Sequence, residues 1–279
     1  MIRASKPLPD VQKTPDERGI DIDEVGVSNI RYPIAFPLRD GGHCNTVATV
    51  SMRVSLPHYE KGTHMSRFMI ALQENVRELS PASVEHVLRE LLGLLDADTA
   101  YLDMTFPIFL KRKAPVTGLE GLLDFECAFK GVLKKDGTYD KIVEVRVNAA
   151  SLCPCSKNIS EYGAHNQRSR ITIKVREHSE LMWFEDLIDI AERNASCQLY
   201  PILKRPDEKF VTEKAYENPK FVEDIVRDVA VELLGLLNEN RIKYFFVSSN
   251  NYESIHNHDA YAHVERGEVG TLLSRFSHD

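Results

Sequence analysis

The first half of the chain contains one strand-like and two helix-like patterns of apolar residues in succession. Thr46–Leu56 alternates apolar and polar positions, which predicts a strand buried on one face. Met65–Leu79 instead carries apolar residues at helical spacing. Ser83 suits the N-cap of a second helix that ends near Leu95. The pattern therefore predicts a strand followed by a pair of helices.

Further strands follow, and the same order of elements then returns in the second half. Strands are expected at Tyr101–Leu110 and Gly121–Leu133, and Asp136-Gly137 is a turn signal after the second of them. Pro219 suits the first position of a helix. The other expected strands are Ile142–Ala149, Arg170–Val175 and, last, Ile242–Ser248, and the other expected helices are Trp183–Cys197 and Pro219–Leu237.

Helices that come in pairs, rather than after every strand, favour an α+β fold over a doubly wound α/β sheet. We therefore expect two related modules of antiparallel strands backed by paired helices. The polar, proline-bearing residues 1–30 are expected to form an N-terminal arm, followed by a first module at 31–138 and a second at 139–279. Such modules leave sheet edges open, so the chain is expected to associate with copies of itself.

The charge of the chain narrows the classes of function. A formal net charge of −7 argues against non-specific nucleic-acid binding, although a local cluster of Lys and Arg could hold a small phosphate-bearing ligand. No stretch is apolar for long enough to cross a membrane, and the first residues have no apolar run of the signal-peptide type. We expect a cytoplasmic protein without nucleic-acid or membrane partners.

The placement of the five cysteines is more informative than their number. Cys44, Cys127 and Cys197 stand alone, and lone cysteines of intracellular proteins are most often buried as small apolar residues. Cys153 and Cys155 are one residue apart. An odd count argues against a disulfide framework, so reactive or metal-binding thiols are the better interpretation of the close pair.

The close pair lies in a longer polar motif that also contains a histidine. Cys153-Pro154-Cys155 follows a predicted strand, and His165 comes ten residues after Cys155. Thiolate and imidazole are ligands that zinc prefers. Pro154 fixes the backbone between the thiols, so both side chains need not reach one ion. The alternative is a structural turn with two buried thiols.

Two further polar segments offer ligands. Glu253 and His256 follow the last predicted strand and could share a metal or relay a proton, or they belong to a plain polar loop. Between the last two predicted helices, Lys204 and Arg205 could hold phosphate and Glu208 could ligate a metal. The alternative for this second segment is a solvated charged loop.

The remaining candidate site residues lie at the N-termini of two predicted helices. Glu223 lies in the first turn of a predicted helix, where an acid is favourable beside the helix dipole. His64 and Arg67 open an earlier helix, whose backbone amides favour anions. A helix cap with a surface arginine explains the second pair equally well.

Taken together, four runs resemble GTP cyclohydrolase I of type IB over the chain from about residue 25 onward. They are SLCPCSKNISEYGAHNQRS, LKRPDEKFVTEKAYENPKFVED, ESIHNHDAYA and GTHMSRF. The resemblance implies the tunnelling fold, in which antiparallel strands backed by paired helices assemble around a central channel. It also implies two fused modules and a homotetramer with sites between subunits.

The resemblance further implies a reaction. GTP and water would give formate and 7,8-dihydroneopterin triphosphate, the first step of tetrahydrofolate synthesis. A bound metal ion would lower the pKa of its water, which attacks C8 of guanine. Ring opening gives a formamide, a second hydrolysis releases formate, and the ribose rearranges before the new ring closes. An acid and a base must lie close by.

Roles follow residue by residue from the same resemblance. The expected metal ligands are Cys153 as thiolate, His165, Glu208, Glu253 and His256. Cys153, His165, Glu223 and the second thiol, Cys155, are the expected catalytic residues, although Cys155 could instead be a ligand or structural. Glu223 would also accept from guanine N1–H and the exocyclic amine, which rejects adenine because its N1 is an acceptor. The candidates for the triphosphate are Lys157, Arg168, Lys204, Arg205, His64 and Arg67.

The ion itself stays open. A thiolate, an imidazole and a carboxylate suit zinc, manganese or iron, and no organic cofactor is expected. Two alternatives remain. One is an NADPH-dependent nitrile reductase of queuosine synthesis, a tunnelling-fold enzyme with a nucleophilic cysteine. The other is a non-catalytic oligomeric protein stabilised by a closed zinc site.

Overall fold

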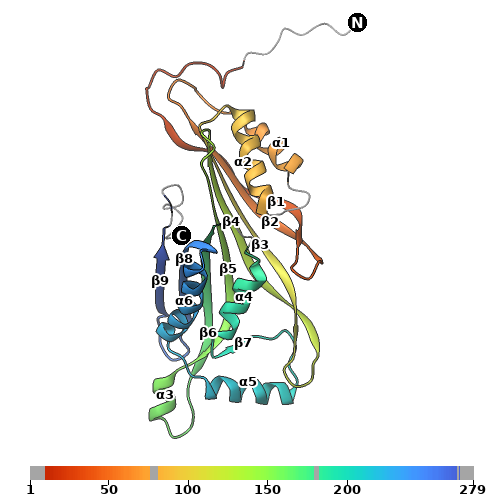
Figure 1. The fold of residues 1–279 in the computed structure, drawn as a ribbon, viewed down its shortest axis with the longest axis vertical. Helices are drawn as coiled ribbons and strands as arrows, with labels where there is room; N and C mark the ends of the chain where they lie inside the picture. Colours follow the sequence, from red (N-terminus) through yellow and green to blue (C-terminus); the bar gives the residue numbers. More distant parts are fainter. Residues whose placement is uncertain (1–9, 76–80, 179–181, 269, 271–279) are drawn as a thin grey trace.

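A single antiparallel sheet runs through the whole molecule (Figure 1). The computed structural model describes residues 10–75, 81–178, 182–268 and 270. Neighbouring strands follow the order β1-β2-β3-β4-β5-β6-β8-β9, and the short β7 pairs with β5. The elements of the first half are β1 (Ile22–Pro37), β2 (His43–Leu56), α1 (Met65–Asn75), α2 (Pro81–Leu95), β3 (Thr99–Lys113) and β4 (Glu120–Lys134).

A hairpin turn connects the strands of the first half of the chain to those of the second half, which extend the same sheet. Gly137 has a φ of 89° and donates its N–H to the Lys134 carbonyl at 2.9 Å, so the expected Asp136-Gly137 turn joins β4 to β5. The elements that follow are β5 (Tyr139–Leu152), α3 (Pro154–Ile159), β6 (Asn166–Glu177), α4 (Phe184–Arg193), β7 (Cys197–Gln198), α5 (Arg205–Glu217), α6 (Val222–Asn238), β8 (Ile242–Tyr252) and β9 (Ala260–Gly267).

The helices pack against the sheet face that carries the apolar side chains of the strands. α2 packs on β3 and β4, α4 on β5, and α6 on β8 and β9. Phe184 of α4 lies 5.2 Å from Phe36, 5.8 Å from Phe106 and 4.9 Å from Phe129, measured between ring centroids. Because these three partners belong to first-half strands, the two halves share one core. Cys44, Cys127 and Cys197 are buried, as expected.

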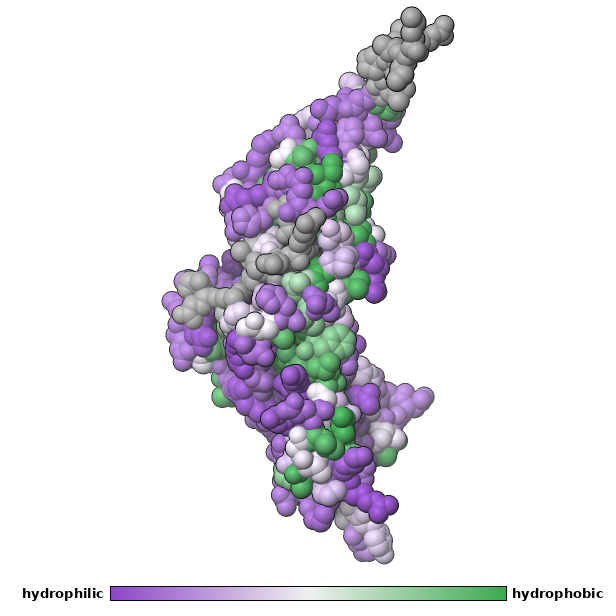
Figure 2. All heavy atoms as spheres, turned by 90° about the vertical axis from the view of Figure 1, so that its right-hand side faces the viewer, coloured by the Kyte–Doolittle hydropathy of each residue, from purple (hydrophilic) through white to green (hydrophobic). Residues whose placement is uncertain are grey.

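Charged side chains of β4, β5 and β6 form ion pairs on the sheet, both within β5 and between strands. Lys130 and Arg146 both approach the buried Glu144, at 3.7 Å and 2.7 Å, and Arg170 approaches Glu126 at 3.3 Å. Figure 2 also shows apolar side chains exposed among polar ones on the side of the molecule to the right in Figure 1. The exposed apolar residues include Val47, Phe109 and Leu122.

Several sequence predictions need correction. β1 begins at Ile22, inside the segment assigned to the arm. Ser83 lies within α2 instead of capping it, and Pro219 precedes α6 by three residues. The strand at Ile242 is not the last, because β9 follows it. Residues 76–79 of the first expected helix lie outside the described residues.

The unpredicted elements lack strong apolar patterns. Pairing of β1 with β2 shifts register twice, between Ile22 and Val25 and between Val27 and Ile30, which breaks the alternation. α5, placed where a loop was expected, buries only Asp207 and Ala215 among its residues. In the described part of the chain, no helix is long and apolar enough to span a membrane.

Candidate functional site

The two strands at the centre of the second half bring Cys153 and His165 together. Leu152, the last residue of β5, pairs with Asn166, the first residue of β6. The next pair outward is Cys153 and His165, and the Cys153 N–H donates to the His165 carbonyl at 3.1 Å. Both residues are half-buried. The ladder therefore fixes both residues at one end of the sheet.

Cys153 is also the N-cap of the short helix α3. The Ser156 N–H points at the Cys153 thiol, with 3.5 Å between N and Sγ, and Pro154 takes the first helical position. The Ser156 hydroxyl donates to the Cys153 carbonyl at 3.2 Å and accepts from the His165 N–H at 3.2 Å. Cys155 is exposed on α3. The two thiols therefore face different surroundings, as the rigid Pro154 allows.

Gln167 links His165 to Glu253, and sequence reasoning missed it. The Gln167 side-chain oxygen lies 2.9 Å from His165 Nδ1, and its amide donates to Ser151 at 3.0 Å and to Glu253 at 3.4 Å. Glu253 Oε2 itself lies 3.8 Å from His165 Nδ1. With Nδ1–H donating to Gln167, the lone pair of Nε2 is available for a ligand bond. The sequence held no signal for this role, because a glutamine near the start of a strand is ordinary until its partners are known.

Glu223 approaches this end of the sheet through its helix. The Lys220 N–H donates to the Leu152 carbonyl at 3.0 Å, so the segment before α6 is attached to the residue before Cys153. The Phe221 N–H donates to the Asp224 carboxylate at 3.0 Å, which caps α6. Glu223 is exposed in the first turn, as predicted.

Lys157 ties α3 to the C-terminal end of α5. Its ammonium donates to the Tyr216 carbonyl and lies 4.4 Å from the centroid of the Tyr216 ring. The sequence analysis predicted that the Lys157 ammonium binds the triphosphate, but here it contacts Tyr216 instead. The phosphate role of Lys157 stays a prediction.

The opposite end of α5 carries Lys204, Arg205 and Glu208, all exposed. The buried Asp207 holds this end in place, because its carboxylate accepts from the N–H groups of Val116, Thr117 and Lys204, at 2.9 to 3.0 Å, and from the Thr117 hydroxyl at 2.7 Å. Burial alone would raise the pKa of Asp207, but these hydrogen bonds outweigh it and hold the pKa well below the ordinary value of 3.8.

Not all candidates meet within one chain. Glu208 is eight residues from Tyr216 along α5, about 12 Å at the rise of an α-helix, and Tyr216 is the α5 residue that contacts Lys157 of α3. His64 lies 3.2 Å from Asp10, and Arg67 donates to the carbonyl of Leu94, both beside the α1–α2 pair at the other end of the molecule.

The remaining two candidates lie nearer to the Cys153 end. His256 is exposed in the loop after β8, with its ring stacked on His258 at 5.0 Å between centroids. Arg168 of β6 is exposed and borders a cavity of about 470 Å³ beneath α5. Neither residue contacts Cys153 through a hydrogen bond or ion pair seen in the described residues.

The donor types at this end fit a divalent metal ion. Cys153, His165 and Glu253 offer a thiolate, an imidazole and a carboxylate, the set that suits zinc, manganese or iron. Among the residues described, no three Cys, His, Asp or Glu side chains of one chain converge closely enough to hold an ion. A metal would therefore need movement of these side chains or a ligand from another chain.

Comparison with known families decides what kind of chain this is. A family model described as type I GTP cyclohydrolase folE2 matches residues 8–262. The chain belongs to this family. GTP cyclohydrolase FolE2 of Magnetococcus marinus is 53% identical over 262 residues, covering 94% of this chain and 97% of the relative. GTP cyclohydrolase FolE2 of Nitrosomonas eutropha is 53% identical over 261 residues, covering 94% and 96%.

Solved structures identify the fold. A uricase from Bacillus fastidious aligns with a TM-score of 0.53 at 9% identity, covering 95% of this chain and 98% of that one. Urate oxidase from Bacillus sp. TB-90 aligns with a TM-score of 0.51 at 9% identity, covering 88% and 100%. At such identities the likeness concerns the fold alone, and it confirms the predicted α+β tunnelling fold. Neither alternative from the sequence analysis, the nitrile reductase or the zinc-stabilised binding protein, finds support among these matches.

Proposed function

We propose that this chain is a metal-dependent GTP cyclohydrolase that converts GTP and water to formate and 7,8-dihydroneopterin triphosphate, the first step of tetrahydrofolate biosynthesis. The observation that carries the proposal is the backbone pairing of Cys153 with His165 at one sheet end, with Glu253 3.8 Å from the His165 imidazole, in a chain whose relatives are named GTP cyclohydrolase FolE2. Thiolate, imidazole and carboxylate are all ligand types that hydrolytic metal sites use.

In this proposal Cys153 and His165 Nε2 hold the ion, which is zinc, manganese or iron. When bound, the ion acts as a Lewis acid and makes water a nucleophile at neutral pH. Gln167 fixes the tautomer and the orientation of His165 through the contact at Nδ1. Glu208 completes the ligands from a second copy of the chain, because its place on α5 is remote from Cys153 of its own chain.

Glu223 recognises the guanine. Its carboxylate is exposed in the first turn of α6, and the contact between Lys220 and Leu152 keeps that turn beside Cys153. One oxygen accepts from N1–H of guanine and the other from the exocyclic amine. Adenine presents an acceptor at N1 and would leave the carboxylate unpaired, so the pairing selects guanine.

Proton transfer falls to the groups around the ion. Glu253 lies 3.8 Å from His165 Nδ1, so it is placed to exchange protons with groups at this end of the sheet. His256 and Cys155 are exposed near the same end and would face the substrate once a second copy closes the site. Cys155 then serves as a ligand, a nucleophile or a structural thiol.

The triphosphate extends toward basic residues. Lys204 and Arg205 stand exposed at the N-terminus of α5, where the helix dipole also favours anions. Arg168 borders the neighbouring cavity, whereas Lys157 and Arg67 donate to backbone carbonyls and would have to exchange those contacts. His64 and Arg67 could reach the phosphates only from another subunit.

Assembly is part of the proposal. β1 and β9 end the sheet, and pairing or packing of these edges between copies would close it into a barrel. We infer a homotetramer in the cytoplasm with sites between subunits. Mixing Cys153→Ala chains with Glu208→Ala chains tests this arrangement, because some mixed interfaces would hold one intact site and recover activity that neither variant has alone.

The reaction is tested with protein freed of metal by a chelator. It is incubated with GTP alone and with added zinc, manganese or iron, and the products are examined for formate and, after oxidation and dephosphorylation, for neopterin fluorescence. The proposal predicts both products only with metal. Folded, oligomeric protein that gives neither product with any of the ions would refute it.

A further inference from the structure

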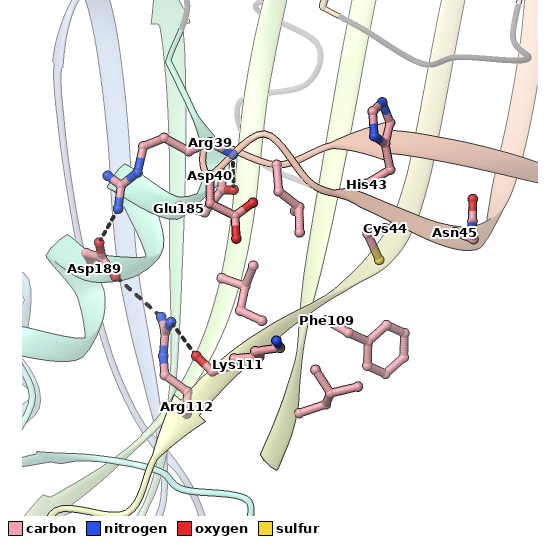
Figure 3. Close-up of a pocket in the computed structure, with 13 residues that line it drawn as sticks. Arg39, Asp40, His43, Cys44, Asn45, Phe109, Lys111, Arg112, Glu185 and Asp189 are labelled. Carbon is pink, nitrogen blue, oxygen red and sulfur yellow. Dashed lines mark hydrogen bonds and ion pairs between the residues drawn. The ribbon is translucent and has the colours of Figure 1, made fainter. Parts of the chain in front are cut away.

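A second cavity lies away from the Cys153 end. Its volume is about 530 Å³, and it opens where the β1–β2 turn meets β3 and the first turns of α4 (Figure 3). It shares no lining residue with the site described above. Its size falls in the range of small-molecule pockets.

Glu185 contributes a buried carboxylate to this cavity. The residue is 7% exposed, and its Oε1 accepts from the Arg39 N–H at 2.8 Å. Its other oxygen, Oε2, is buried without a hydrogen-bond partner among the described residues. In Figure 3 the carboxylate points into the cavity. A buried carboxylate oxygen left unpaired costs free energy, so this position favours a hydrogen-bond donor from outside.

The neighbouring guanidinium groups are already neutralised. Arg39 pairs with Asp186 and lies 3.4 Å from Asp189. Arg112 lies 3.3 Å from Asp189 and 2.7 Å from Glu192. Among the described residues that line the cavity, none donates to Glu185 Oε2, and both guanidinium groups are engaged by carboxylates.

Part of the cavity wall is apolar, and one of its residues, Phe109, is aromatic. Leu38, Cys44 and Leu110 line it, and Phe109 and Leu122 are exposed at 42% and 60%. Lys111 and His43 also line the cavity and are exposed, so solvent screens their charge. An aromatic ring and a delocalised cation both pack favourably on a phenylalanine ring.

We propose that this cavity binds a small ligand in which a planar amidinium or guanidinium group is attached to an aromatic ring. The cationic group donates to Glu185 Oε2, and the ring packs on Phe109 and Leu122. A planar cation suits the site because its N–H groups lie in one plane and can reach a carboxylate in a narrow space. The inference is independent of the reaction proposed above.

Benzamidine is the probe for the test. Trp183, the only tryptophan of the chain, directly precedes α4 and lies two residues from Glu185, so its fluorescence reports on this cavity. Benzamidine is titrated into the full-length protein by fluorescence and by calorimetry, beside neutral benzamide of the same shape. The proposal predicts saturable binding of benzamidine that benzamide does not reproduce.

Variants locate the probe. Glu185→Gln should weaken binding about tenfold or more, as expected when a charge-assisted hydrogen bond is lost. Phe109→Ala should weaken it as well. Glu17→Gln, which removes an exposed carboxylate before β1, at the end of that strand opposite the cavity, and Glu223→Gln should bind as the parent does. Glu185→Gln should unfold at the same or a higher temperature than the parent, because it removes an unpaired buried charge.

Three outcomes would overturn the proposal. One is the absence of benzamidine binding to the folded parent protein. The second is equal binding to the parent and to Glu185→Gln. The third is binding that Glu223→Gln abolishes and Glu185→Gln leaves intact, which would place the probe at the other carboxylate.

Discussion

The backbone N–H of Cys153 donates to the carbonyl of His165 at 3.1 Å, which extends the β5–β6 ladder by one pair beyond its last residues. Cys153 and His165 are twelve residues apart in the sequence, and this hydrogen bond places them next to each other. Cys153 and His165 are both half-buried, whereas the neighbouring Cys155 is exposed. The metal proposal depends on this adjacency.

Replacing Cys153 with alanine is predicted to abolish metal-dependent activity. Loss of a ligand should exceed the roughly 10- to 100-fold effect that loss of a ligand's hydrogen-bond partner has, so we expect a decrease of at least about a hundredfold. Bound metal is measured together with formate release. Circular dichroism should be unchanged, because the Sγ contact with the Ser156 N–H is long, at 3.5 Å. Full activity in a folded Cys153→Ala protein would remove Cys153 from the site.

Gln167→Ala is predicted to weaken metal binding about 10- to 100-fold without changing the ligands themselves. The reason is that Gln167 holds His165 Nδ1 at 2.9 Å and thereby fixes which nitrogen faces the ion. Competition with a metal chelator measures the affinity. Thr172→Ala, a half-buried change further along β6, is the matched control and should keep the parent's affinity. Equal affinities for Gln167→Ala and the parent would mean that another group orients His165.

The fold was predictable where burial leaves a periodic pattern. Tyr101–Leu110, for example, lies within β3, whose inward positions are nearly all buried. α5 was missed because its main anchor is polar: Asp207 bonds to the β3–β4 turn, and no apolar stripe marks the helix. β9 was missed because it packs as an edge strand with few buried residues.

Some site residues could be predicted from the sequence, and others could not. Motif spacing predicted Cys153 and His165 as one group, because the ends of neighbouring strands meet. Gln167 gave no such signal, since a glutamine in a strand is ordinary until its partners are known. The place of Glu208 could not be predicted either, because it depends on how α5 lies across the end of the sheet and on which chain it faces.

Glu223→Gln is predicted to lower kcat/KM for GTP about 10- to 100-fold, because a charged acceptor of two guanine N–H groups is lost. Most of the change should fall on KM if guanine is held equally before and during the reaction. Asp224→Asn is the neighbouring control: Asp224 accepts from the Phe221 N–H, so its loss should lower the unfolding temperature but spare GTP selectivity. Unchanged kinetics in Glu223→Gln would contradict the recognition role.

Asp207→Asn is predicted to lower the unfolding temperature by several degrees at neutral pH and to reduce activity, because α5 loses its attachment to the β3–β4 turn. The pKa of Asp207 is lowered in the folded state from an ordinary value of 3.8. Its contribution to stability is therefore present above about pH 4 and is lost as the pH falls toward the lower folded pKa. Thermal unfolding at several pH values should show the difference between parent and variant shrinking below about pH 4. A difference that stays constant across that range would mean that the charge of Asp207 does not stabilise the fold.

The fate of C8 of GTP tests the central claim most directly. GTP labelled with ¹³C at C8 is incubated with metal-loaded protein, and the label is followed by NMR. Our account predicts that the label leaves as formate, one per dihydroneopterin triphosphate formed, and that Cys153→Ala or removal of the metal stops the release. Label that remains in the nucleotide, with folded and metal-loaded parent protein, would contradict the account.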